Sequence, residues 1–408
     1  MSDDKLLSNC AVIDSTRDQP LRDAAVWISG NRIAAVGTTQ QVLEALGDRP
    51  HQLVNLGGRY LSPGLINMHT HLSLGLPGPY GVDIQSMSPE QLVLHMANGA
   101  TRTLDCGITT IRCVGEKDHA DFPLKAAIEG GKLTGPRIFT AGRPVACTGG
   151  HGHPGSIEVD GPTGFRRGVR EQIRAGADFI KVMISGGIAG EHEEIHTRQV
   201  TREELEAAIS TAHDWNRKIT AHAGPGPLIA EAVALGLDCV EHGYQLTDDV
   251  TEAMAAANCA LVPTLIVTRC KAFFDQLRVP EWMQQRSLQA ADRHMESYRS
   301  ALAAGVTVML GSDMPPFWEF EGTNSTVREL EHMSENGLGA RGALAAATSI
   351  PAQWLEVGDS LGTVEVGKFA DLIVTESDPA TDTSTYRTVS AVVKDGEIVR
   401  NDHTVVYQ

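Results

Sequence analysis

Eight short apolar runs, each followed by a loop and a helical pattern, occupy the middle of this 408-residue chain. They span residues 64–71, 108–114, 137–142, 178–185, 218–223, 238–243, 260–267 and 306–312. A short apolar run followed by a longer helical pattern is typical of a buried parallel strand and its crossover helix. Eight such alternations predict an α/β fold of the (β/α)8 TIM-barrel class.

Short β-like runs separated by turns make up both ends of the chain. The N-terminal part contains CAVID, AAVWISG, NRIAAVG and HQLVNLGG, and the C-terminal part contains FADLIVTES, VSAVVKDGEIVRN and HTVVYQ. No long helical pattern separates these runs, and Asp395-Gly396 is a strong hairpin signal. We expect antiparallel strands from both ends to pair into one small β-sandwich domain, 1–62 and 361–408, beside a barrel domain, 63–360.

Composition limits the partners and the compartment. A 408-residue chain with 42% hydrophobic residues can bury one barrel and a smaller domain. A net charge of -17 without a basic stretch argues against nucleic acid. No run approaches the roughly 20 apolar residues of a membrane span, and the acidic start MSDDKLL is unlike a signal peptide. Seven cysteines without a C-x-x-C pair indicate reduced thiols. We expect a cytoplasmic homo-oligomer that acts on a small molecule.

Six polar residues lie near the C-terminal ends of these expected strands, where a (β/α)8 barrel keeps its catalytic side chains. They are His69, His71, Lys181, His222, His242 and Asp313. Any one of them alone is more typical of a hydrogen-bonded structural residue. His69 and His71 are two residues apart, so on a strand they face the same side and can bind one ion together. The six together predict a binuclear metal site, with zinc favoured by imidazole and carboxylate ligands.

Lys181 is the unusual member of this set, because it lies in the apolar run DFIKVMIS. An unpaired ammonium is costly to bury, and a lysine at a strand end commonly extends to water instead. A neutral lysine amine can take up carbon dioxide and become an anionic carbamate, whose two oxygens can bridge two cations. We therefore predict a carboxylated Lys181.

The stretch His192-Glu193-Glu194-Ile195-His196 matches H-E-x-x-H, which on a helix places two zinc ligands on one face. It follows three glycines and ends shortly before Thr201, which with Glu204 forms a predicted capping box for the next helix. No amphipathic helix of useful length fits between them. We interpret the stretch as a loop that does not bind the metals, in which His192 or His196 either contacts substrate or faces solvent.

Taken in order, the HTH of LINMHTHL, the IK of DFIKVMIS, the histidines of TAHAG and VEHGY and the SD of LGSDM resemble the metal-dependent amidohydrolase superfamily over almost the whole chain. The stretches TGGHGH, GADFIKVMISGG, VEHGY and LGTVEVGKFADLIV are most similar to imidazolonepropionase-like proteins and Xaa-Pro or Xaa-Arg/Lys dipeptidases. The resemblance implies a barrel with a composite β-sandwich and two divalent metal ions.

The resemblance also implies how the ions are shared. One ion takes His69, His71, Lys181 and Asp313, and the other takes Lys181, His222 and His242. Asp313 then holds a bridging hydroxide, accepts its proton during attack on a carbonyl, and passes that proton to the departing amine. The chemistry implied is hydrolysis of an amide, lactam, ester or related bond.

Loop residues beside the expected metals are candidates for holding substrate. In the resembling dipeptidases a histidine in the loop after strand three and a tyrosine after the strand-six ligand help to hold the scissile carbonyl. The matching residues are His151 and Tyr244, which are otherwise a turn histidine and a core tyrosine. For His153, two residues beyond His151, the same two alternatives apply, a substrate contact or a turn histidine.

Three further residues are candidate substrate contacts. Phe317 and Trp318, after the last expected strand, form an apolar wall of the site or pack between barrel and loop. Arg269, just past strand seven, pairs with a substrate carboxylate or lies at the surface.

The motifs favour one reaction among several. Amidohydrolase-type deaminases commonly carry H-x-x-E on strand five, whereas Ala-Gly-Pro follows His222, which argues against a deaminase. Our leading hypothesis is a binuclear metal-dependent hydrolase that cleaves the amide bond of a dipeptide or N-acyl amino acid. The alternatives are hydrolysis of a non-peptide amide, carbamate, lactam or lactone, xenobiotics included, and a noncatalytic protein that binds a small carboxylate.

Overall fold

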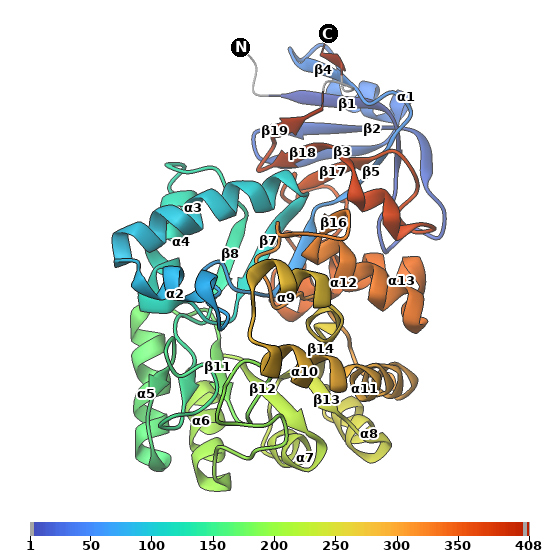
Figure 1. Cartoon of the computed structure of the whole chain (residues 1–408). Coiled ribbons are helices and arrows are strands. Elements are labelled where there is room, and N and C mark those ends of the chain that lie inside the picture. The colour runs from blue at the N-terminus through green and yellow to red at the C-terminus, as the bar shows by residue number, and fades with distance from the viewer. Residues whose placement is uncertain (1–3, 403–405, 408) are drawn as a thin grey trace.

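The computed structural model describes residues 4–402 and 406–407. Parts of the expected first domain, including most of the run HTVVYQ, therefore lie outside the described residues. The chain adopts a mixed α/β fold, as predicted. A β-sheet built from both ends of the chain lies at one end of the molecule, and helices surround parallel strands in the rest (Figure 1).

The terminal sheet has nine strands in the order β19-β18-β17-β5-β1-β2-β3, with β4 joined to β1 and β20 joined to β4. Its strands are β1 (Lys5–Val12), β2 (Leu21–Ser29), β3 (Arg32–Thr38), β4 (Gln52–Asn55), β5 (Tyr60–Pro63), β17 (Leu372–Thr375), β18 (Val389–Lys394), β19 (Glu397–Asn401) and β20 (Val406–Tyr407). The antiparallel pairing of β17 with β5 joins the two ends of the chain. The expected hairpin at Asp395-Gly396 is confirmed, with φ of 49° and 80° at its two turn residues.

The expectation of purely antiparallel pairing is wrong for two strand pairs. β1 runs parallel to β4 and to β5. Parallel neighbours need a crossover connection. The hairpin of β2 and β3 and the helix α1 (Thr39–Leu46) supply that connection, because they return the chain to the starting end of β1 before β4 begins.

The remaining chain contains two sheets of parallel strands. Their orders are β6-β7-β8 and β10-β9-β11-β12-β13-β14. The strands are β6 (Leu65–Thr70), β7 (Ile108–Cys113), β8 (Arg137–Thr140), β9 (Val145–Ala146), β10 (Ile157–Glu158), β11 (Ile180–Met183), β12 (Ile219–Pro225), β13 (Cys239–Gln245) and β14 (Ala260–Val262), and a separate hairpin is formed by β15 (Glu319–Phe320) and β16 (Thr323–Asn324). The short strands β9 and β10 are additional to the expected eight.

Backbone hydrogen bonds outside these strands connect the two parallel sheets. On one side the Asp178 amide donates to the Thr140 carbonyl, which joins β8 to the residues before β11. On the other side residues 306–312 lie between β14 and β6, since Met309 N donates to Leu261 O and Met68 N donates to Leu310 O. The expected strand at 306–312 is thus a hydrogen-bonded segment with a single parallel bridge, and not a regular strand.

The expected strand at 260–267 is also shorter than predicted. It ends at Val262, because Thr264 adopts a left-handed φ of 53° and a 3-10 helix over Leu265–Thr268 follows. The deviation redirects the chain at the edge where the candidate site lies.

Helices follow the parallel strands, and their apolar faces pack against the strands in two large buried clusters. They are α2 (Pro79–Ser86), α3 (Pro89–Asp105), α4 (Asp121–Glu129), α5 (Gly161–Ala175), α6 (Arg202–Asp214), α7 (Gly226–Ala234), α8 (Asp248–Ala256), α9 (Lys271–Leu277), α10 (Glu281–Gln289), α11 (Ala291–Ala303), α12 (Ser325–Met333), α13 (Gly339–Ala346) and α14 (Ser349–Trp354). The predicted capping box of Thr201 and Glu204 begins α6. None of the helices in the described ranges is both long and apolar enough to cross a bilayer.

Candidate metal centre and cavity

Parallel strands bring the predicted ligands to one edge of the sheets. His69 lies in β6 and His71 directly after it, His222 lies in β12 and His242 in β13. Asp313 follows the hydrogen-bonded segment 306–312, and its amide donates to the His69 carbonyl. Residues up to 244 positions apart in the sequence therefore meet, because the carboxyl ends of parallel strands share one edge.

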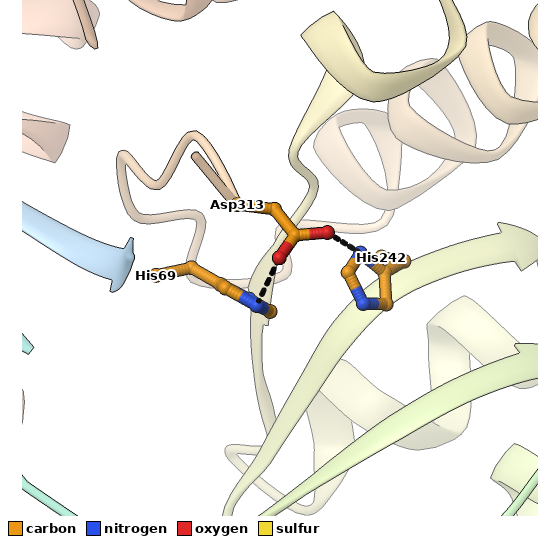
Figure 2. Close-up of side chains that lie close together, drawn as sticks. All are labelled: His69, His242 and Asp313. Atoms are coloured by element: carbon orange, nitrogen blue, oxygen red, sulfur yellow. Dashed lines mark ion pairs between the residues drawn. The ribbon is translucent and has the colours of Figure 1, made fainter. Parts of the chain in front are cut away.

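The Asp313 carboxylate is the centre of this group. Its Oδ1 lies 3.0 Å from His69 Nε2 and 3.2 Å from His71 Nε2, and its Oδ2 lies 4.0 Å from His242 Nδ1. Figure 2 shows Asp313 between His69 and His242, with one oxygen directed at each ring. His69, His242 and Asp313 offer ligand atoms that all lie within 4.8 Å of one another. Such a set can hold a divalent cation.

The backbone at two of these residues is held in an uncommon conformation. Asp313 has φ of 55° and His242 has φ of 70°, in the left-handed region that residues other than glycine rarely occupy. Surrounding structure has to maintain such conformations, and they concentrate at functional sites.

The charges of the group depend on burial and on each other. Burial alone would raise the pKa of Asp313, but His69, His71 and His242 hold it well below its usual range. Burial lowers the pKa of His222 and of His242 far below the ordinary value, with further lowering from neighbouring histidines and Lys181. Asp313 is therefore ionised and the imidazoles of His222 and His242 are neutral near pH 7, which is the state in which they can ligate metal. Against the effect of burial, Asp313 raises the pKa of His71.

The second ring nitrogens support a metal site. His69 Nδ1 lies 2.7 Å from a Glu241 oxygen, and His71 Nδ1 lies 2.6 Å from the Gly115 carbonyl. His222 Nε2 lies 3.1 Å from the Gly186 carbonyl, and His242 Nδ1 lies 2.7 Å from the Thr264 hydroxyl. Each imidazole thus has one nitrogen fixed by a partner outside the candidate ligand group, as is usual for metal-ligating histidines, while Nε2 of His69 and of His71 faces the Asp313 carboxylate. The residues present fit divalent metal ions.

Lys181 lies in β11 with only 2% of its surface exposed. Burial lowers the pKa of its amine to about 8, against partial compensation from Glu241 and Asp313. Its charge acts on His222 and His242 as well, so the amine belongs to the same group of side chains. A buried lysine whose pKa approaches neutrality has the free amine that carbamate formation needs.

A buried triad that sequence reasoning missed supports His69. Glu241 accepts hydrogen bonds from His69 Nδ1, from the Arg112 guanidinium and from the Thr220 hydroxyl, and Arg112 also donates to the Met68 carbonyl. We call His69, Glu241 and Arg112 the strand triad, because all three come from β6, β7 and β13. Burial would raise the pKa of Glu241, but Arg112 and then His69 hold it well below its usual range.

A cavity of about 670 Å³ opens beside the candidate metal ligands. His71, His222 and Asp313 line it, as do the predicted substrate contacts His151, His153 and Tyr244. Its volume lies within the range of small-molecule sites in proteins. Segments 73–78, 149–155 and 188–193 form much of the wall, and the first two are rich in glycine.

Two of these residues are packed on the histidine ligands. The His151 ring stacks on His222 with centroids 4.0 Å apart, and the Tyr244 ring stacks on His242 with centroids 5.1 Å apart. Burial raises the pKa of the Tyr244 phenol well above its usual value, so it keeps its proton. Both side chains line the cavity next to candidate ligands.

Three other predicted substrate contacts do not line the cavity. The Arg269 guanidinium donates to the Thr268 hydroxyl and to the carbonyls of Leu265 and Ala291. Phe317 packs against Arg102, and Trp318 packs against the rings of Tyr80 and Phe273. Of the two alternatives for Phe317 and Trp318, the structure therefore shows packing between barrel and loop, and not an apolar wall of the cavity. Arg269 is instead held within the protein by its own hydrogen bonds.

The H-E-x-x-H stretch forms a loop without helix, as predicted. His192 is exposed and lines the cavity, whereas His196 is exposed and does not. Glu193, the second residue of the stretch, is the informative one, since it bonds to His151 Nδ1. Burial raises the pKa of Glu193, but the hydrogen bond and charge of His151, together with the hydrogen bonds of Gln199 and the Gly187 backbone, lower it overall. The motif had drawn attention to the histidines of this stretch and not to its glutamate.

Another buried carboxylate shapes the loop after His71. Glu116 accepts from the amides of Leu72 and Ser73 at 2.7 and 2.8 Å and from the Ser73 hydroxyl at 2.5 Å. It follows the expected strand 108–114 at the same edge as the ligands, a position that marks it as a candidate in the sequence.

Comparison with known proteins agrees with this geometry. The sequence profile of the Amidohydrolase family matches residues 60–399. The chain is 29% identical over 410 residues to an ochratoxinase of Aspergillus niger, covering 92% of this chain and 82% of the relative. It is 24% identical over 395 residues to an imidazolonepropionase of Geobacillus sp., covering 87% and 84%.

The fold has solved counterparts as well. A prolidase complexed with N-methylphosphonate-L-proline superposes with a TM-score of 0.86 at 28% sequence identity, covering 98% of this chain and 100% of that chain. The similarity that the motifs predicted, to imidazolonepropionases and dipeptidases, is confirmed.

Proposed function

The chain belongs to the amidohydrolase family, and from this premise we propose that it is a binuclear metal-dependent hydrolase that cleaves the amide bond of a dipeptide or N-acyl amino acid. The observation that carries the proposal is the convergence of His69, His242 and Asp313 with their ligand atoms within 4.8 Å. Relatives that are hydrolases acting on amide bonds support the reaction class.

We propose two zinc ions as the metal complement. One ion is held by His69, His71, Lys181 and Asp313, and the other by Lys181, His222 and His242, with Lys181 carboxylated. Bound zinc supplies Lewis acidity toward a carbonyl oxygen and lowers the pKa of water. The ring orientations of the four histidines, each fixed through one nitrogen, and the buried Lys181 amine support this assignment.

Asp313 acts as the proton shuttle in this proposal. Its carboxylate is ionised and lines the cavity, so it can accept the proton of an attacking water and return it to the departing nitrogen. His151 and Tyr244 hold the scissile carbonyl oxygen from the cavity wall. Tyr244 suits this role because its phenol stays protonated and can donate a hydrogen bond.

The charges of the cavity wall favour a second candidate substrate, one without a carboxylate. Among the described residues that line the cavity, Lys117 is the only lysine or arginine, and its amine already donates to the carbonyls of Gln85 and Met87. Carboxylates on the wall are Glu116, Glu191, Glu193 and Asp313. The described wall thus offers no guanidinium that could bind a substrate carboxylate. A neutral, non-peptide amide or carbamate is therefore the second candidate substrate.

A substrate panel with and without chelation tests the proposal. Matched pairs of a dipeptide and its C-terminal amide, N-acyl amino acids and their amides, and aryl carbamates are incubated with the metal-loaded protein. We expect hydrolysis that stops on chelation and returns with zinc. Preference for the free acids supports the dipeptide class, and preference for the amides supports the second candidate. Stable binding of small carboxylates without any turnover would instead support a noncatalytic binder.

We further propose the finer architecture. The segments around β6, β7, β8, β11, β12, β13, β14 and 306–312 form a (β/α)8 barrel over residues 63–360, and residues 1–62 and 361–408 form a β-sandwich domain. The hydrogen bonds from Asp178 to Thr140 and from Met68 to Leu310 support closure of the ring of strands. Free cysteines at all seven positions support the cytoplasm as its location. Homo-oligomerisation remains a prediction.

A further inference from the structure

Three residues from two loops form a closed ring of hydrogen bonds at the cavity wall. His151 Nδ1 shares a short hydrogen bond with Glu193 Oε1, and Gln199 Nε2 donates to Glu193 Oε2 at 2.5 Å. The His151 amide donates to Gln199 Oε1 at 2.9 Å, which closes the ring. We call these three residues the loop ring. It ties the loop after β9 to the loop after β11.

The loop ring determines which nitrogen of His151 is available. Both oxygens of Glu193 act as acceptors, so Nδ1 is the donor and carries a proton. Among the described residues no hydrogen bond to His151 Nε2 is found. The ring plane is also restrained, because it stacks on His222 with an angle of 19° between the planes. Whether the imidazole is neutral or charged, Nε2 is therefore the nitrogen left for a bound molecule.

Two glycines leave space for this arrangement. A Cβ added at Gly187 would lie 2.8 Å from both ring nitrogens of His151, and one added at Gly190 would lie 2.7 Å from Glu193 Cγ. Neither glycine has a positive φ, so the requirement is for space and not for backbone freedom. The backbone of the second loop thus packs directly against the histidine and its carboxylate partner.

From this geometry we propose that Glu193 is a positioning residue for turnover, which holds His151 through Nδ1 so that the Nε2–H of its imidazolium form donates to the substrate carbonyl oxygen. Glu193 itself touches neither substrate nor metal in this role. The inference rests on the proposed hydrolysis for its kinetic readout. The competing explanation is that the loop ring only fastens two loops together.

Kinetics of a set of variants separates the two explanations. In Glu193→Ala we expect kcat to fall by about 10- to 100-fold, the range seen when an outer partner of an active-site histidine is removed. Glu193→Gln keeps an acceptor for Nδ1 but turns its amide nitrogen toward Gln199 Nε2, so it should recover kcat in part. Glu194→Ala is the matched control, because it removes a charge from the same loop at a side chain that is 57% exposed and bonds to Arg286 and not to His151. Metal content should stay unchanged in all three.

Coupling to His151 is the decisive comparison. If Glu193 acts through His151, the double variant His151→Ala with Glu193→Ala should be no slower than His151→Ala alone. Gly187→Ala offers a second route, since its methyl group displaces the ring while every hydrogen-bonding group remains; we expect a similar fall in kcat. Multiplying effects in the double variant, or a Glu193→Gln variant as slow as Glu193→Ala, would overturn the proposal.

A measurement independent of activity keeps this inference apart from the proposed function. Long-range nitrogen-proton NMR spectra of the intact protein, assigned by difference with His151→Ala, report which ring nitrogen is protonated. We expect a proton on Nδ1 of His151 in the parent protein and a mixture of tautomers in Glu193→Ala. The same spectrum in both would refute the inference even if hydrolysis is established, and the expected change would support the positioning even if no substrate in the panel is cleaved.

Discussion

The strand triad and the loop ring use the same interaction in two different settings. In each, a glutamate oxygen bonds to histidine Nδ1, so that Nε2 is directed at the candidate site: toward Asp313 for His69, and without a hydrogen-bond partner among the described residues for His151. The side chains of His69, Glu241 and Arg112 are at most 1% exposed, whereas those of His151 and Glu193 are 14% and 8% exposed. The strand triad also contains a guanidinium, while an amide completes the loop ring.

The difference indicates a division of labour. A fully buried ionic group is costly to leave unpaired, so the strand triad affects folding and metal binding together. The loop ring lies on loops at the cavity, where residues can change without disturbing the packed strands. Variants at the strand ends should therefore lose metal or stability, and variants in the loops should change turnover or affinity alone.

The largest expected effect is at Lys181, which belongs to the strand side of this comparison. Lys181→Ala removes the group that we propose to bridge both ions, so metal content and activity should both be lost. Partial rescue by acetate or formate is expected, because a small carboxylate can occupy the same position. Bound metal and turnover are measured together. An unmodified Lys181 amine directed away from the metals in a well-resolved crystal structure would contradict this.

Asp313 is the expected exception among the strand-end residues, because its substitution should separate metal binding from turnover. Asp313→Asn keeps an oxygen that can coordinate, but it has no basic group to accept a proton. We expect much of the metal to remain while kcat falls by at least about 100-fold, the low end for general acid-base catalysis. Turnover within a few-fold of the parent, with metals retained, would make Asp313 only a ligand.

Arg112 tests whether the strand triad stabilises the fold. Arg112→Leu leaves the Glu241 carboxylate buried without its cation, so we expect a loss of about 3–5 kcal/mol in the free energy of unfolding by urea. The double variant with Glu241→Leu should recover part of that loss, since no unpaired charge is left. Additive losses in the double variant would show that the two residues do not act as a pair.

The smallest effect is expected at the exposed histidines of the loop side. Changing His192 and His196 together to alanine should leave metal content intact and alter KM by a few-fold at most, because both are exposed and neither lies among the candidate ligands. Metal analysis and steady-state kinetics check this. Loss of both metals would show that the H-E-x-x-H stretch is a true zinc site.

The sequence allowed the mixed α/β fold and the proximity of His69, His242 and Asp313 to be predicted, because both follow from local patterns of strand ends and residue types. The glutamates that bond to His69 and His151 were not predictable in the same way. Glu241 is 172 residues from His69, and Glu193 is 42 residues from His151. Such pairs depend on which strands become neighbours and on how the loops fold. The hydrophobic periodicity of the sequence carries no information about strand order or loop conformation.

Loop side chains were the least predictable for a related reason. Arg269, Phe317 and Trp318 follow expected strands just as His151 and Tyr244 do. The chain turns at Thr264, however, and the 3-10 helix that follows directs Arg269 toward α11. A turn of this kind leaves no apolar period, so the sequence alone could not indicate the direction of these side chains.

The central claim is that this fold builds a metal-dependent hydrolase at its strand ends, and metal titration tests it most directly. Protein stripped of metal by chelation is titrated with zinc while bound metal and turnover of the best panel substrate are followed. The account predicts an inactive stripped protein whose activity rises to its maximum as about two ions per chain bind, the complement of a binuclear hydrolase site. Full activity in the metal-free protein would contradict it.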